Sequence, residues 1–256
     1  MEPIKSIVDL LLAIENTGLT KKENAHVRVW FRGQANHEWS LSPGVYRDRW
    51  RTKSEPDRLR IERHLSQEFR IQSGGILTEA RDDAALYFLQ QHYKMPTRLL
   101  DWTTNPLAAL HFAVEGHPNV DGKFFVMDAY NLAFHQKVPK EDFIGIATGR
   151  NPLFRNGLQP IVNWGKEKLF PTFIMPVRPD HFERRMMLQK GCFTFHPPNK
   201  GTLTAKEIGS LFSGIVPKDS KPRIKKELSL LGIDAFAVYG DLDSLAARLK
   251  SSYGLA

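Results

Sequence analysis

The chain has 256 residues, 41% of them hydrophobic and 25% charged, which is typical of a soluble globular protein with a sizeable core. Its single cysteine, Cys192, excludes intramolecular disulfides and a zinc site of several cysteines. The net charge of +8 fits attraction to nucleic acid, to a nucleotide phosphate or to an acidic partner; the alternative is that dispersed surface lysines and arginines serve solubility. No apolar run approaches the roughly 20 residues of a membrane helix, and no signal peptide is visible. We therefore expect a cytoplasmic protein with no membrane partner.

The spacing of apolar residues predicts an alternation of helices and strands along the chain. In the first part of the chain we expect a helix at 3–16, a strand at 27–31 that Gly33 breaks, an irregular segment at 34–53, and helices at 55–72 (ended by Gly74 and Gly75), about 81–93 and 105–115. A strand at 123–127 and an unclear region at 129–170 follow. In the last part we expect strands at 173–175, 191–196 and 213–217, a helix at 222–231, a strand at 235–238 and a last helix after its N-cap Asp241.

This mixture of elements predicts an α+β fold, with a small mixed sheet flanked by helices. No internal repeat or clear linker divides the chain, so we expect a single domain over residues 1–256. A domain boundary inside the unclear region, 129–170, remains the alternative.

The segment from Gln91 to Thr103 carries the densest group of functional side chains. It is too polar for a core strand and too aromatic for an ordinary solvated loop. Pro96 disfavours a helix through the segment, because the residue before a proline is pushed toward an extended conformation. An apolar stretch at 106–114 follows directly. A polar segment that leads into a buried helix indicates a site mounted on a rigid scaffold.

Three motifs stand out along the chain: Trp30-Phe31-Arg32-Gly33-Gln34, the segment 91–103 with Asn105 to Ala113, and Arg185 with Gln189 to Thr194. Together they resemble the FRG domain family, and the resemblance extends over about residues 27–250. Lys94 and Tyr239-Gly240 depart from the family pattern, which has Gly and an aromatic-Pro pair at these places. The resemblance implies an accessory or effector protein of bacterial or phage conflict systems.

The first motif places a guanidinium at a strand end, where Arg32 is suited to bind phosphate or carboxylate and Gly33 would let a ligand approach the backbone. Alternatively, Arg32 pairs with Asp101 and holds two elements together. His92 and Tyr93 are candidates for acid–base chemistry or for binding a ribose and a ring. The alternative is that His92 caps its helix and Tyr93 packs.

The order of the motifs also resembles that of ADP-ribosyltransferases: Phe31-Arg32-Gly33, then Thr103 leading to Ala109 and Phe112-Ala113, then a third strand near residues 183–195. This resemblance implies NAD as ligand and a glutamate on the third strand. Gln189 lies at the better-spaced position for it, Glu183 fits poorly, and a glutamine lacks the charge that stabilises an oxocarbenium ion. The predicted catalytic residues are Arg32, His92, Asp101 and Gln189, and the predicted cofactor-binding residues are Gly33, Gln34, Tyr93, Thr97, Arg98 and Thr103.

Two other classes of function stay open. A nucleic-acid-binding or nuclease component of a defence system is the first; its candidate track is Arg28, Arg32, Arg47, Arg49, Arg51 and Lys53, interleaved with Trp30, Trp39 and Trp50. A catalytically inactive regulator that binds a protein partner is the second. The spacing of histidines and carboxylates supports no metal site. Cys192 lies in an apolar stretch and is expected to be a buried hydrophobe.

Overall fold

The computed structural model describes residues 2–47, 50–74, 82–136, 145–163, 165–180 and 184–255. The strands are β1 (Val29–Gln34), β2 (Leu99–Thr103), β3 (Gly122–Asp128), β4 (Ala147–Thr148), β5 (Met175–Arg178), β6 (Gly191–Phe195) and β7 (Leu211–Val216). The helices are α1 (Ile7–Asn16), α2 (Ala25–Arg28), α3 (Glu55–Ser73), α4 (Asp83–His92), α5 (Pro106–Val114), α6 (Ala129–His135), α7 (Pro152–Val162), α8 (Arg184–Leu188), α9 (Ala205–Ile208), α10 (Lys221–Leu230), α11 (Ala235–Tyr239) and α12 (Leu242–Ser252).

The strands form one sheet in the order β4-β5-β6-β2-β1-β3-β7. Neighbouring strands are antiparallel, except that β4 runs parallel to β5. The predicted α+β class, a mixed sheet flanked by helices, is confirmed. None of the described helices is both long enough and apolar enough to cross a membrane.

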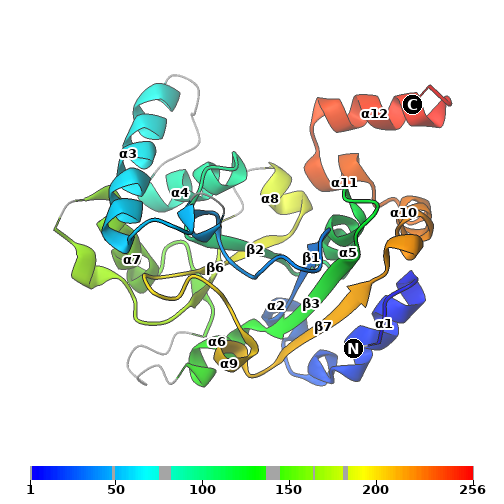
Figure 1. The fold of residues 1–256 in the computed structure, drawn as a ribbon, viewed down its shortest axis with the longest axis horizontal. Coiled ribbons are helices and arrows are strands. Elements are labelled where there is room, and N and C mark those ends of the chain that lie inside the picture. The colour runs from blue at the N-terminus through cyan, green and yellow to red at the C-terminus, as the bar shows by residue number, and fades with distance from the viewer. Residues whose placement is uncertain are drawn as a thin grey trace.

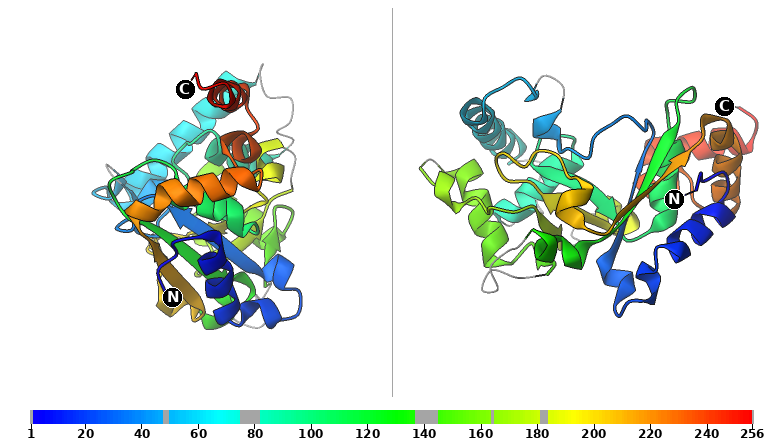
Figure 2. Two further views of the ribbon diagram at one scale, coloured as in Figure 1. Left: turned by 90° about the vertical axis from the view of Figure 1, so that its right-hand side faces the viewer. Right: turned by 60° about the horizontal axis from the view of Figure 1, so that its bottom comes forward.

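Two groups of helices cover one face of the sheet, and they stand apart from each other (Figures 1 and 2). Helices α1, α5 and α10 pack on the half formed by β1, β3 and β7. Helices α3, α4 and α7 pack on the half formed by β2, β5 and β6. The opposite face packs against α6 and α9 around the buried rings of Trp30 and Trp102. The gap between the two helix groups therefore lies over the junction of β1 and β2.

Several predicted elements are confirmed because their signals are local. The carboxamide of Asn105 accepts hydrogen bonds from the first turn of α5, and Asp241 caps α12 in the same way. Helices α3, α4 and α10 lie close to the predicted ranges. The predicted helix end at Gly75 lies outside the described residues.

Several local predictions are wrong. The strand predicted at 173–175 begins only at Met175, as β5, and residues 27 and 28 of the first predicted strand belong to α2. Gly33 does not break the first strand, because β1 continues through it in register with β3 as far as Gln34. Residues 235–238 form helix α11 instead of a strand, since Asp234 caps the helix by accepting from the Ala237 amide at 2.9 Å. Gly240 then ends α11 in the left-handed conformation.

Candidate functional site

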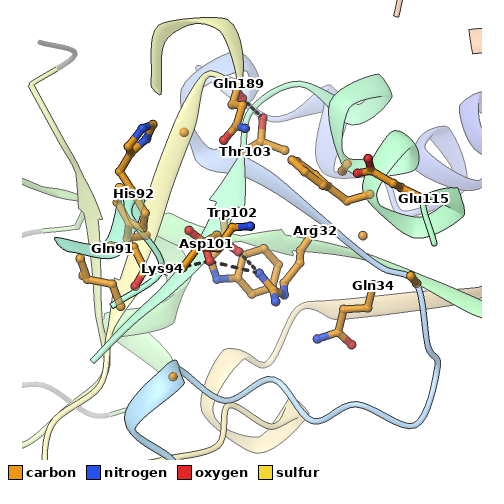
Figure 3. A pocket seen from close by; sticks show the side chains of 18 of the residues that line it. Arg32, Gln34, Gln91, His92, Lys94, Asp101, Trp102, Thr103, Glu115 and Gln189 are labelled. Carbon is orange, nitrogen blue, oxygen red and sulfur yellow. Dashed lines mark hydrogen bonds and ion pairs between the residues drawn. The ribbon is translucent and has the colours of Figure 1, made fainter. Parts of the chain in front are cut away.

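A cleft of about 880 Å³ opens where the sheet splits between β1 and β2 (Figure 3). These strands pair only at Phe31 and Thr103, whereas β1 pairs with β3 along its whole length. Beyond that pair, Arg32–Gln34 of β1 and Asp101 and Trp102 of β2 are not paired with each other, and they form the two sides of a wedge that lines the cleft. The cleft has the size of a small-molecule site.

Arg32 reaches across the wedge from β1 to β2. Its Nη1 atom donates a hydrogen bond to the Asp101 carbonyl oxygen at 2.6 Å and lies 3.9 Å from the Asp101 carboxylate. Burial lowers the pKa of Arg32 to about 10, so the guanidinium stays charged at neutral pH. Its Nε atom is buried and has no hydrogen-bond partner among the described residues. The alternative that Arg32 pairs with Asp101 is therefore confirmed, and the Nε–H donor of Arg32 remains unused among the described residues.

Asp101 is held in place by a chain of hydrogen bonds from the end of α4 and the segment that precedes β2. The Gln91 amide donates to the Asp101 carboxylate at 2.9 Å, and the Thr97 hydroxyl donates to the Gln91 side-chain oxygen. Thr97 also accepts from the Leu99 amide at 3.1 Å. The Asp101 side chain is 57% exposed, so this carboxylate faces the cleft beside the guanidinium.

Thr103 and Gln189 meet at the closed end of the wedge. The Thr103 hydroxyl donates to the Gln189 carbonyl oxygen at 2.5 Å and accepts from the Asn105 amide at 2.8 Å. The side-chain amide nitrogen of Gln189 is buried without a hydrogen-bond partner among the described residues. Arg32, Thr103 and Gln189 thus line one cleft, although 157 residues separate the first from the last in the sequence. Glu183 lies outside the described residues.

His92 and Tyr93 separate at the end of α4. His92 is the last residue of the helix and lines the cleft, while Tyr93 is exposed and does not. The Tyr93 ring packs against Phe69, with ring centroids 6.3 Å apart. The alternative that Tyr93 serves packing therefore fits the structure better than a role in ligand binding.

Residues 27–122 match the family model of the FRG domain. The chain contains an FRG domain. No curated protein and no solved structure matches the chain. The matched segment spans β1, β2 and α5, so it supplies Arg32, His92, Asp101 and Thr103. Gln189 lies beyond the match.

Besides Tyr93, two further predicted ligand-binding residues of the FRG domain do not line the cleft. Arg98 is fully buried, and its guanidinium pairs with Glu62 at 2.9 Å and with Glu55 at 2.7 Å. These ion pairs attach β2 to α3, so Arg98 has a structural role. Thr97 is also buried and acts by orienting Gln91.

Gly33 is required by packing against α5, and it also lines the cleft, so the approach of a ligand to its backbone stays a prediction. A Cβ atom on Gly33 would lie 1.8 Å from the Ala109 carbonyl oxygen of α5. The α-carbon therefore faces the helix backbone. Gln34, two positions from Arg32, lines the cleft with its side chain almost wholly buried, and its Oε1 atom has no hydrogen-bond partner among the described residues.

The proposed nucleic-acid track is not a continuous surface in the structure. Arg28 is tied to Asp128 by a 2.7 Å ion pair, and Trp30 is buried in the core. Arg32 lies in the cleft with its side chain 13% exposed, and Arg49 lies outside the described residues. Of the interleaved aromatics, Trp39 and Trp50 line the cleft.

Metal-binding and thiol chemistry find no support in the described part of the chain. No group of three or more His, Cys, Asp or Glu residues is placed there to hold a metal ion. Cys192 is buried in β6, and burial raises the pKa of its thiol well above the ordinary value. A thiol in that state is not a nucleophile.

Sequence reasoning missed most of the charged wall of the cleft. Its further charged and aromatic residues are Arg47, Lys94, Phe112, Glu115, His117, Arg185 and Tyr239. Lys94 has φ +60°, a left-handed conformation that costs a non-glycine residue free energy and is frequent at functional sites. The departure from glycine at this position was one signal, and the presence of Arg185 in the third motif and of Arg47 in the predicted nucleic-acid track were two others. Glu115 and Tyr239 gave none, because only the fold brings them together.

Proposed function

We propose that the FRG-domain cleft binds a nucleotide, with NAD as the first candidate. The observation that carries this proposal is the convergence of Arg32, Thr103 and Gln189 on one cleft at the split between β1 and β2. The resemblance to ADP-ribosyltransferases assigns this set of residues to NAD.

The charges of the cleft suit a pyrophosphate. Arg32, Arg47, Lys94 and Arg185 all line it. Arginine binds phosphate oxygens through two parallel N–H donors, and a partly buried guanidinium binds more strongly than an exposed one. The unused Nε donor of Arg32 and the unpartnered amide of Gln189 supply further hydrogen-bond capacity at the same end.

The proposal is that the cleft binds NAD; catalytic turnover of NAD is a separate extension of it. Gln189 carries no charge, so it cannot replace a glutamate that stabilises a developing oxocarbenium ion. An ADP-ribosyltransferase-like activity, within a bacterial or phage conflict system, extends the proposal and rests on the resemblances described above. Release of nicotinamide from labelled NAD would establish that extension.

The test is an equilibrium titration of NAD into the wild type and Arg32→Ala. Loss of the guanidinium is expected to weaken NAD binding by at least about tenfold. Arg60→Ala is the matched control, because Arg60 on α3 is 65% exposed and its removal changes the net charge equally. This control should bind NAD as the wild type does.

The outcomes separate nucleotide binding from nucleic-acid binding. Absence of NAD binding by the wild type would refute the proposal. Binding of single-stranded DNA or RNA that weakens steeply with salt and falls equally in Arg32→Ala and Arg60→Ala would favour the nucleic-acid alternative. A strong loss of NAD binding in Arg32→Ala alone supports the proposal.

A further inference from the structure

One wall of the cleft carries a carboxylate that the roles above leave unused. Glu115 follows α5 directly and lines the cleft, with its side chain 40% exposed (Figure 3). The Tyr239 hydroxyl of α11 donates a hydrogen bond to its Oε2 atom, and the Nε2 atom of His111 lies 3.4 Å from the same oxygen. The carboxylate is therefore fixed in position.

Glu115 keeps its negative charge. Burial acts to raise its pKa, but the contacts with His111 and Tyr239, together with the charge of Lys225, outweigh burial and hold the pKa below its ordinary value. Among the described residues, no arginine or lysine lies within ion-pair distance of this carboxylate. Asp101, by contrast, lies beside the Arg32 guanidinium. Glu115 is thus an anion with no described arginine or lysine in ion-pair contact, in a cleft that is also lined by the cations Arg32, Arg47, Lys94 and Arg185.

Aromatic rings surround this carboxylate. Phe112 and Tyr239 line the same wall, with their ring centroids 6.1 Å apart and their planes at 71°. The Arg185 guanidinium lies 4.6 Å from the centroid of the Tyr239 ring. The ring thus already holds one cation against its face. An anionic carboxylate with two aromatic rings is a chemical environment that favours organic cations.

We infer that Glu115, Phe112 and Tyr239 form a subsite for a cationic aromatic ring, which in NAD is the pyridinium of the nicotinamide. The inference rests on the proposed function and assigns a direction to the dinucleotide. The pyrophosphate lies toward Arg32, and the nicotinamide riboside lies toward the end of α5. NAD carries a negatively charged pyrophosphate and a positively charged pyridinium. It therefore matches a cleft with a cation at Arg32 and an anion at Glu115.

The test compares two ligands that differ in this one charge. NAD has a positively charged pyridinium, whereas the dihydronicotinamide of NADH is neutral. Both are titrated at the same pH and the same salt concentration. The wild type should prefer NAD by at least about fivefold, and Glu115→Gln should reduce the preference to about one.

A matched variant controls for the loss of a hydrogen-bonded glutamate. Glu227 on α10 accepts from Arg223 and from the Ile7 amide, each at 2.8 Å, and does not line the cleft. Glu227→Gln should keep the full preference. Should Glu115→Gln not fold, Tyr239→Phe takes its place, because it releases the carboxylate from its hydrogen bond and should reduce the preference.

The outcomes distinguish the inference from the proposed function. If the wild type binds neither dinucleotide, the proposed function fails and the subsite falls with it. Equal binding of both dinucleotides by the wild type overturns the inference alone. A preference that survives in Glu115→Gln, or in Tyr239→Phe where that variant is used, also overturns it. A preference lost in Glu115→Gln and kept in Glu227→Gln supports it.

Discussion

The close approach of α5 to β1 can be tested by one methyl group at Gly33. A Cβ atom there would lie 1.8 Å from the Ala109 carbonyl oxygen and 2.7 Å from the Ala113 amide nitrogen. Ordinary contacts of this kind begin at 3.4 Å, so Gly33→Ala requires α5 to retreat from the sheet by about 1.6 Å. Both obstructing atoms belong to the backbone, which prevents relief by a side-chain rotation.

Overpacking a core usually costs about 1–3 kcal/mol, and the rigid helix backbone places Gly33→Ala at the upper end of this range. We therefore expect the free energy of unfolding to fall by about 3 kcal/mol and the melting temperature by about 8 °C. Urea unfolding followed by tryptophan fluorescence measures the loss. Because α5 leads to Glu115, the variant should also bind NAD less tightly.

Gly74→Ala is the matched control at the end of α3. Gly74 has right-handed φ and ψ angles, and its added Cβ atom would meet backbone oxygens only at 3.6 Å. The same substitution there should stabilise the protein slightly, by less than about 1 kcal/mol. A Gly33→Ala protein whose stability lies within about 0.5 kcal/mol of the wild type would refute the packing of α5 on β1 described above.

Two further predictions concern strain and pH. Lys94→Gly removes a left-handed lysine, so it should raise the free energy of unfolding by about 0.5–1 kcal/mol while weakening NAD binding about threefold; a destabilised variant would contradict this account of the turn. Burial lowers the pKa of His196 from 6.5 to about 3, so the unfolded chain binds a proton that the folded protein excludes. Its contribution to stability is complete above pH 6.5 and falls by about 1.4 kcal/mol per unit as pH drops toward 3. Urea midpoints of His196→Gln should depend less on pH across this window, and parallel pH profiles would exclude His196 as the cause.

The sequence predicted best those elements whose signals are local. Asn105 and Asp241 are side chains that cap helices, and α5 and α12 begin where these residues indicate. Residues 235–238 could be assigned either way, because a short apolar run fits a strand or a buried helix. The cap at Asp234 and the glycine at Gly240 decide the outcome.

Tertiary contacts explain what sequence reasoning missed. Position 33 requires glycine because α5 lies against it, and no neighbouring residue in the sequence encodes that contact. Arg98 has the residue type of an anion-binding group, yet its partners Glu55 and Glu62 come from α3. Glu115 and Tyr239 are 124 residues apart and meet only in the folded protein. Motif order predicted the cleft through Arg32, Thr103 and Gln189, whereas the charged wall depends on the fold.

Hydrogen exchange with and without saturating NAD tests the central claim most directly. The account predicts that NAD protects amides in residues 31–35, 91–103 and 185–191, which contribute to the cleft. Arg32→Ala should abolish this protection, and Arg60→Ala should retain it. Binding of NAD with protection elsewhere, or with no dependence on Arg32, would contradict the assignment of the cleft as the nucleotide site.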